Sequence, residues 1–150
     1  MSSLEPNKNF KWIVECAKQR KDQTFVVGGT INKGVFSDDG ISECPPNIRL
    51  IGYISDEEVK TLMRDCKAFI YPTFYEGFGI PPMEAIAAGT EQVIVSDTEV
   101  MHEIYEDNVS YINPYEYACE WDEKKVNRDI LRKYSWEKSA NKLLEILREF

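Results

Sequence analysis

The chain has 150 residues, 43% of them hydrophobic, and a formal net charge of −8 at pH 7. This length and composition predict one globular domain with a hydrophobic core, and no apolar run reaches the roughly 18 residues of a membrane span. The acidic balance argues against nonspecific nucleic-acid binding, which needs a basic surface. Because residues 1–5 also lack the pattern of a signal peptide, we expect a soluble, cytoplasmic protein.

The charge is uneven along the chain. Residues 1–33 carry six Lys/Arg against three acids, whereas residues 34–123 carry four against nineteen, and residues 124–150 are basic again with eight against four. A phosphate-bearing ligand needs local positive charge, so the N-terminal segment is one place to look for the basic residues that would bind it.

The four cysteines are widely scattered, and His102 is the one histidine of the sequence. With no CxxC pair, a zinc site is not expected. We interpret the cysteines as buried or half-buried free thiols, which fits a reducing cytoplasm. They are Cys16, Cys44, Cys66 and Cys119.

Periodicity and turn residues predict the elements in chain order. Ser55 opens a capping-box pattern, and Gly89 is a natural helix stop. The expected elements are a helix over 7–20, a strand over 24–27, a long loop over 30–47 with a short strand near 35–36, a strand over 48–51, a helix over 56–65, a strand over 68–71, a helix over 81–88, a strand over 93–95, a helical turn over 97–105, a strand over 109–112, helical segments over 115–120 and 124–133, and an amphipathic helix from Trp136.

Strands that alternate with helices imply a parallel sheet covered by helices on both faces. The predicted fold is therefore α/β, a Rossmann-like doubly wound parallel sheet in a single domain over residues 1–150. Before the first helix only residues 2–4 are left for a strand, so the chain looks like one piece of a longer protein.

The segment 76–89, EGFGIPPMEAIAAG, carries most of the functional information. On one continuous helix, Glu76 and Glu84 would lie about 80° apart and two turns distant, so a helix pairs them poorly. Gly77 and Gly79 favour a loop, and the two prolines that follow suit a first helical turn. This strand, glycine loop and helix suit a phosphorylated, hydroxyl-rich ligand, because main-chain N–H groups can hold phosphates and a carboxylate can accept from a sugar diol.

Each of these residues also has a simpler interpretation. Glu84 at a helix start is favoured by the helix dipole without any ligand. Glu76 beside glycines also fits an ordinary solvated loop acid, and Phe78 also fits a residue that simply fills the core. Taken singly, none of them identifies a function.

Taken together, the motifs resemble the C-terminal domain of retaining glycosyltransferases of the GT-B architecture, family 4 or "group 1". The resemblance covers nearly the whole chain, and the order and spacing of its markers are specific. The markers are residues 4–10, 26–29, 51–58, 75–85, 95–97 and 134–136.

The resemblance implies roles for the residues around the glycine loop. Glu84 would bind the ribose hydroxyls of a nucleotide-sugar donor, and Glu76 would lie close to the donor sugar. Backbone N–H groups of Phe78, Gly79 and Ile80 would face the diphosphate or the sugar.

Further residues would complete this donor site. Tyr53 and Ile54 would contact the base, and Gly29 is counted with the nucleotide-binding residues. Lys8 matches a lysine that neutralises the diphosphate, a task that enzymes of this class meet with basic side chains and no metal or other cofactor. Glu76 and Lys8 are thus the candidate catalytic residues, although without the resemblance Lys8 would be read as an ordinary solvated lysine.

The resemblance implies a parent enzyme that moves a hexose, such as mannose or glucose, from a nucleoside diphosphate sugar to a glycan or lipid-linked acceptor in polysaccharide biosynthesis. Its partner would be the N-terminal acceptor domain, which the sequence does not contain, so the isolated chain should transfer little or nothing. A membrane would be reached only through that domain or a lipid acceptor. Many relatives carry an arginine near the position of Ser2 or Asn7, and neither residue is basic here, so half of the usual diphosphate clamp is absent or supplied from elsewhere.

Other functions remain as alternatives. A non-catalytic nucleotide- or protein-binding module that needs a partner chain would use the uneven charge as an interface. A phosphoacceptor signalling domain fits poorly because the third predicted strand ends at Tyr71 and Pro72 instead of an aspartate cluster. A dinucleotide oxidoreductase would need a GxGxxG turn, which is missing. We interpret His102 as a surface helix residue.

Overall fold

The structure, a computed structural model, describes residues 5–29 and 43–149. The expected strand near residues 35–36 and the position of Ser2 lie outside the described residues. The elements in chain order are η1 (Pro6–Lys8), α1 (Phe10–Gln19), β1 (Phe25–Gly28), β2 (Ile48–Gly52), α3 (Asp56–Asp65), β3 (Phe69–Tyr71), α4 (Ile80–Ala88), β4 (Val93–Ser96), α5 (Glu99–Tyr105), β5 (Ser110–Ile112), η2 (Arg128–Arg132) and α6 (Trp136–Arg148).

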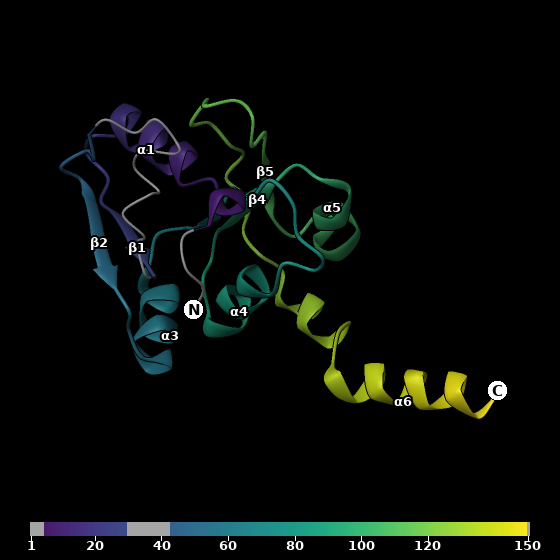
Figure 1. The fold of residues 1–150 in the computed structure, drawn as a ribbon. Helices are drawn as coiled ribbons and strands as arrows, with labels where there is room; N and C mark the ends of the chain where they lie inside the picture. The colour runs from purple at the N-terminus through teal and green to yellow at the C-terminus, as the bar shows by residue number, and fades with distance from the viewer. Residues whose placement is uncertain (1–4, 30–42, 150) are drawn as a thin grey trace.

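The strands pair in parallel throughout the described chain. β1 pairs with β2, and β3, β4 and β5 form a second group with β4 in the middle. The parallel α/β architecture that the sequence predicts is therefore confirmed, with the strands in two hydrogen-bonded groups (Figure 1). α3 lies between β2 and β3 in the chain and connects the two groups.

Helix α1 packs against both groups of strands. Its residues Phe10 and Val14 form one cluster with Ile48 of β2, and its Trp12 forms another with Ile94 of β4. All five side chains are buried. The apolar faces of one helix thus hold the two strand groups together.

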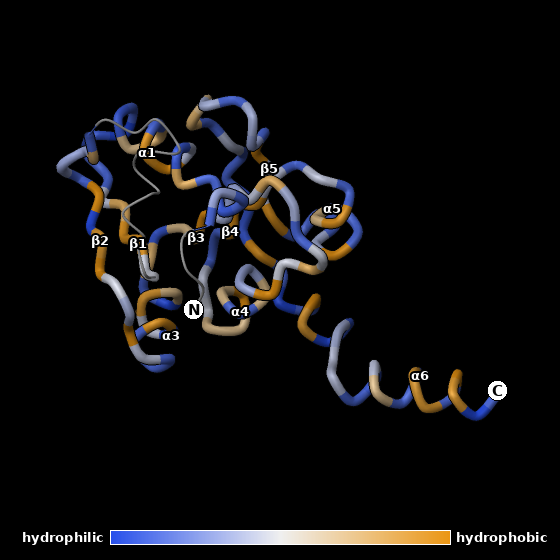
Figure 2. The backbone as a smooth tube through the Cα atoms, viewed as in Figure 1, coloured by the Kyte–Doolittle hydropathy of each residue, from blue (hydrophilic) through white to orange (hydrophobic). Residues whose placement is uncertain are grey.

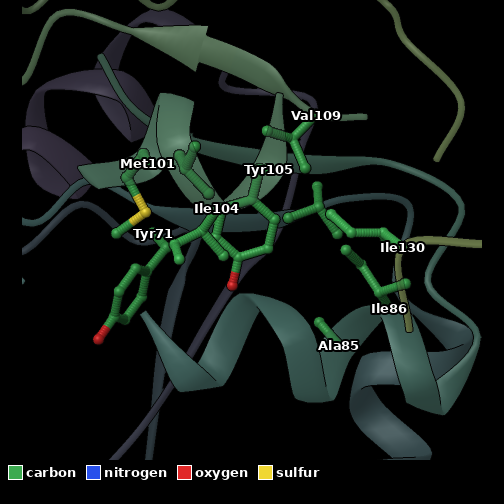
Figure 3. Close-up of a cluster of buried hydrophobic side chains, with 10 residues drawn as sticks. Tyr71, Ala85, Ile86, Met101, Ile104, Tyr105, Val109 and Ile130 are labelled. Atoms are coloured by element: carbon green, nitrogen blue, oxygen red, sulfur yellow. The ribbon is translucent and has the colours of Figure 1, made fainter. Parts of the chain in front are cut away.

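A further core lies between the three-stranded group and helices α4 and α5. Ala85 and Ile86 of α4 contact buried residues of α5, and Figure 3 shows Met101, Ile104 and Tyr105 packed above α4. Tyr71, the last residue of β3, lies at the edge of this cluster. Its hydroxyl points away from the other labelled side chains.

The local signals for helix ends are confirmed. Ser55 accepts a hydrogen bond from the Glu58 N–H at 3.3 Å, and the Glu58 carboxylate accepts one from the Ser55 N–H at 2.8 Å. Gly89 ends α4 in the left-handed conformation, with φ of 115°. Short-range chemistry therefore sets where α3 begins and where α4 ends.

The helical segment expected over 115–120 does not form, and the one expected over 124–133 is present only in part, as the 3₁₀-helix η2. Within that stretch the structure has only the 3₁₀-helix η2, and residues 117–127 run without a helix. The reason lies in α1, whose side chains Trp12, Gln19 and Arg20 donate to the carbonyls of residues 116, 117 and 119. Carbonyls that a local helix would use are bonded to α1 instead.

The prediction that all cysteines are free is also wrong. Cys16 and Cys119 are both buried as expected, but they form a disulfide between α1 and the segment after β5. Cys44 and Cys66 are free and half-buried. Because the pair is separated by 103 residues in the sequence, no local pattern indicates it.

Helix α6 extends away from the other elements (Figure 1). Its hydrophobic stretches show as orange in Figure 2. Its residues Leu143 and Leu147 are 57% and 61% exposed, and none of its described residues is buried. The predicted amphipathic pattern is present, with its apolar side open. Across the described residues, no helix combines the length and apolar character needed to cross a membrane.

Candidate functional site

Three side chains meet beside the carboxyl end of β3. The Lys8 Nζ lies 2.6 Å from Glu76 Oε1 and donates to the Tyr71 hydroxyl at 3.0 Å, and this hydroxyl donates to the same Oε1 at 2.6 Å. The Lys8 and Glu76 side chains are only 20% and 17% exposed. The two residues that the sequence predicts as catalytic are therefore brought together, although 68 residues separate them.

The turn that carries Lys8 is held by its neighbours. The Asn7 carbonyl accepts a hydrogen bond from the Phe74 N–H at 2.9 Å, which ties the turn to the segment leading to Glu76. Asn9 adopts a left-handed conformation with φ of 52°, and its Nδ2 donates to the Pro114 carbonyl at 2.8 Å. Lys8 thus sits between two anchored residues.

The glycine loop is constrained at one glycine and open at the other. Gly79 is buried with φ of 80°, and a Cβ there would lie 2.8 Å from Met101 Cε. Its carbonyl accepts a hydrogen bond from the buried Tyr105 hydroxyl. A Cβ at Gly77 would meet nothing within 4 Å among the described atoms. The loop therefore has a fixed end at Gly79 and free space at Gly77.

Helix α4 begins with few amide donors of its own. Its second and third residues, Pro81 and Pro82, have no N–H, and no side chain of the described residues caps its start at Gly79. Ile80 is the first residue of α4, and Glu84 is exposed on it. As the sequence predicts, Glu76 lies in the loop and Glu84 in the helix.

The Phe78 side chain packs into the protein. Its ring meets the Tyr134 ring edge to face, with centroids 5.1 Å apart, and it borders the core cluster of α4 and α5. For this side chain the simpler interpretation as a core residue is confirmed. The role predicted for Phe78 concerns its backbone N–H and stays a prediction.

The carboxyl ends of β1 and β2 are joined. The Gly29 N–H donates to the Gly52 carbonyl at 2.8 Å, and Gly52 has φ of 64°. Tyr53, immediately after this glycine, is 80% exposed, whereas Ile54 is half-buried. Of the residues expected to contact a base, Tyr53 thus presents an aromatic ring that is largely exposed to solvent.

One cavity of about 1250 Å³ connects the two groups of strands. The predicted residues Lys8, Ile54, Ile80 and Glu84 line it, and so does Tyr71. Other predicted residues, Gly29, Tyr53, Glu76, Phe78 and Gly79, do not line it. Glu76 is linked to the cavity through its bonds to Lys8 and Tyr71.

The electrostatics of the cluster favour a charged lysine and a neutral tyrosine. Burial opposes the charge of Lys8, but hydrogen bonds to Glu76 and Tyr71 outweigh it and raise the Lys8 pKa above its usual 10.5. Burial, and then the hydrogen bond to Glu76, raise the pKa of Tyr71 to about 12. At neutral pH the cluster therefore holds Lys8 as an ammonium group and Tyr71 as a neutral hydroxyl.

Sequence reasoning missed two tyrosines of this site. Tyr71 was expected only as a strand end, and Tyr105 as part of a helical turn. The one available signal for Tyr71 was a polar-tipped aromatic at the carboxyl end of a buried strand, where ligands bind in α/β sheets. Nothing local indicates that Tyr105 reaches Gly79, which is 26 residues away.

Two other predictions concern metals and His102. Within residues 5–29 and 43–149, no group of three or more His, Cys, Asp or Glu side chains is placed to hold a metal ion. His102 lies on α5 as expected, half exposed. Its Nε2 is 2.6 Å from Asp97 Oδ1, and its ring stacks on Tyr111.

Solved structures share this fold. Sucrose-phosphate synthase from Thermosynechococcus elongatus superposes with a TM-score of 0.71 at 16% identity, over 97% of this chain and 43% of that one. HepE from Anabaena, in complex with UDP and glucose, gives a TM-score of 0.62 at 20% identity, over 78% and 34% of the two chains. These are glycosyltransferases of the GT-B type, and the predicted fold relationship is confirmed.

Curated relatives are similar in sequence over part of their length. The O-antigen chain mannosyltransferase RfbU of Salmonella typhimurium is 42% identical over 72 residues, which are 48% of this chain and 20% of the relative. The O-antigen chain mannosyltransferase B of Escherichia coli is 29% identical over 115 residues, 71% of this chain and 30% of the relative. The chain thus spans less than a third of the length of either.

The sequence profile that describes "Glycosyl transferases group 1" matches residues 1–149, almost the full length of the chain. With the parallel α/β fold, the loop glutamate beside a lysine and the helix glutamate all present, this match settles the family. The chain belongs to the group 1 glycosyltransferases.

Proposed function

We propose that this chain is the nucleotide-sugar-binding part of a retaining glycosyltransferase that moves a hexose from a nucleoside diphosphate to a glycan or lipid-linked acceptor. The names of the relatives, two O-antigen chain mannosyltransferases, support mannose as the sugar and polysaccharide synthesis as the process. A separate acceptor domain would complete the site, and the isolated chain would not transfer sugar. The cytoplasm is the compartment that we propose.

The observation that carries the proposal is the Lys8–Glu76 ion pair of 2.6 Å next to the uncapped start of α4, with Lys8 and Glu84 lining one cavity. An ammonium group can stabilise the charge on a departing diphosphate, because it sits where that charge develops. The positive end of the α4 dipole adds to this effect. Metal ions need not supply that charge, so we expect none.

The other groups would hold the rest of the donor. The N–H groups of Phe78, Gly79 and Ile80 would bind the diphosphate or the sugar. Pro81 and Pro82, which follow them, have no N–H group to donate. Glu84 would accept two hydrogen bonds from the ribose diol, and the strand ends near Gly29, Tyr53 and Ile54 would contact the base. As the diphosphate leaves, positive charge develops at the anomeric carbon, and the Glu76 carboxylate would stabilise it.

Calorimetric titration of the chain with UDP, GDP and ADP tests this proposal. We expect one of them to bind, and Glu84→Ala to weaken it at least tenfold, the effect of about 1.4 kcal/mol or more from a lost charge-assisted hydrogen bond. Glu145→Ala, which removes another exposed carboxylate, on α6, is the matched control and should bind as the wild type does. No binding of any of the three at millimolar concentration would refute the proposal.

A further inference from the structure

The Tyr71 hydroxyl uses both of its hydrogen-bonding roles within the cluster. An ammonium group can only donate and an ionised carboxylate can only accept. The hydroxyl therefore accepts from Lys8 Nζ at 3.0 Å and donates to Glu76 Oε1 at 2.6 Å. Together with the direct Lys8–Glu76 contact, this closes a triangle of three polar groups.

The two oxygens of the Glu76 carboxylate are treated differently. Oε1 accepts both hydrogen bonds, from Lys8 and from Tyr71. No hydrogen bond from the described residues reaches Oε2. The carboxylate is thus held by one oxygen, while the other keeps its capacity to accept.

Tyr71 is the best anchored of the three residues. It lies in β3, is 9% exposed, and belongs to the core cluster that includes α4 and α5. Lys8, in contrast, lies on a three-residue 3₁₀ turn and Glu76 on a loop. The Lys8 Nζ also lies 5.2 Å from the centre of the Tyr71 ring, a cation–π distance. The ring is therefore the support against which the two charged side chains are placed.

We propose that Tyr71 is a positioning residue of the donor site: its hydroxyl orients the Glu76 carboxylate so that Oε2 is presented to a hydroxyl group of the donor sugar. This inference rests on the function proposed above and deepens it. Lys8 keeps its own contact with Glu76 without Tyr71, so the hydroxyl acts mainly on sugar recognition and little on the diphosphate. Because the pKa of Tyr71 is near 12, the hydroxyl stays neutral and acts as a hydrogen-bond donor and not as a base.

Tyr71→Phe tests the inference because it removes one oxygen and keeps the buried ring. The wild type and the variant are titrated by calorimetry with UDP, GDP and ADP, and with UDP-glucose, GDP-mannose and ADP-glucose. We expect the variant to bind the sugar nucleotide about tenfold more weakly and the matching nucleoside diphosphate within threefold of the wild type. Tyr75→Phe removes an exposed hydroxyl next to Glu76 and should change neither.

A double-mutant cycle with Glu76→Gln shows whether Tyr71 acts through Glu76. In the Glu76→Gln background, Tyr71→Phe should change sugar-nucleotide affinity less than twofold, because the carboxylate that it orients is gone. If Tyr71→Phe weakened sugar-nucleotide affinity by the same factor in both backgrounds, the inference would be contradicted. A second readout is the NMR signal of the Tyr71 Cζ carbon in wild-type protein labelled with ¹³Cζ-tyrosine. The sugar nucleotide should change the chemical shift of this signal well beyond the change caused by the nucleoside diphosphate alone. Equal changes would count against the inference.

The outcomes separate the two proposals. If the wild type binds neither kind of ligand, the proposed function fails and this inference fails with it. If the wild type binds both and Tyr71→Phe weakens both equally, or neither, only the role of Tyr71 is refuted.

Discussion

The two groups of strands differ in how firmly they hold the residues at their carboxyl ends. At the end of β3, Tyr71 is buried and bonded to two charged side chains, and the glycine loop that follows is locked at Gly79 against Met101. At the end of β2, Tyr53 is 80% exposed. The β3 end, with the glycine loop, is thus the rigid side of the molecule, and the β2 end is the open side.

The helices that follow these strands differ in the same way. α4 buries three of its nine residues, whereas the ten-residue α3 buries none. In the proposed function, the diphosphate and sugar would meet preformed groups, while the base would meet a surface free to adapt. Preorganisation matters most where charge develops, which is the β3 end.

The largest expected effect is on the rigid side. Gly79→Ala should lower the free energy of unfolding by about 3 kcal/mol, because a Cβ is disfavoured at φ of 80° and would overlap Met101 Cε at 2.8 Å. Gly77→Ala, two residues away with open space around it, should change it by less than about 0.5 kcal/mol. Urea denaturation measures both, and equal losses would mean that the loop is not locked at one end.

Alkaline pH should loosen the rigid side next. The folded-state pKa values of Lys8 and Tyr71 are raised, so both groups keep their protons longer in the folded protein than in the unfolded one. Their contribution to stability is complete below about pH 10 and is lost as the pH rises through the folded values, near 12 for Tyr71. Urea denaturation between pH 8 and pH 12 should show this decline, and Tyr71→Phe should show a shallower one. A variant as steep as the wild type would contradict the assignment.

The smallest expected effect is on stability, when one helix cap is removed on the open side and one on the rigid side. Ser55→Ala and Thr98→Ala each remove an N-cap hydrogen bond, at the starts of α3 and α5. Each cap contributes about 1 kcal/mol. Because α5 buries Met101, Ile104 and Tyr105, losing its cap should lower Tm by about 3 °C.

Without its cap, α3 should instead fray locally, because none of its described residues is buried. Its amides should exchange about fivefold faster in hydrogen-exchange measurements, while Tm falls by less than about 1 °C. Equal shifts in Tm for the two variants would show that α3 is as tightly coupled to the core as α5 is.

Elements were predictable where their signals are local. The strand expected over 68–71 is β3, and the helix expected over 81–88 is α4 with one residue added at its start. The cap at Ser55 and the stop at Gly89 were predicted because the residues that make them lie within five positions of each other. Glu76 and Glu84 were assigned to loop and helix on the same basis.

What remained unpredicted depends on contacts that are distant in the sequence. Residues 115–120 have a helical pattern, but α1 side chains roughly 100 positions away take their carbonyls. The Cys16–Cys119 pair and the separation of β1–β2 from β3–β5 likewise follow from tertiary packing. Lys8 was found only through the family resemblance, and Tyr71 was missed because its hydroxyl partners lie on two other segments.

The hydrogen bond from Asn9 to the Pro114 carbonyl has a consequence for the order of folding. Its two ends are 105 residues apart, so forming it closes a loop that spans most of the chain. During synthesis, the turn carrying Lys8 leaves the ribosome long before β5 and the residue that anchors the turn. Contacts of such long range form late and slow folding. A spectroscopic label beside Lys8 would therefore follow one of the last steps of folding, although the residue is among the first to be made.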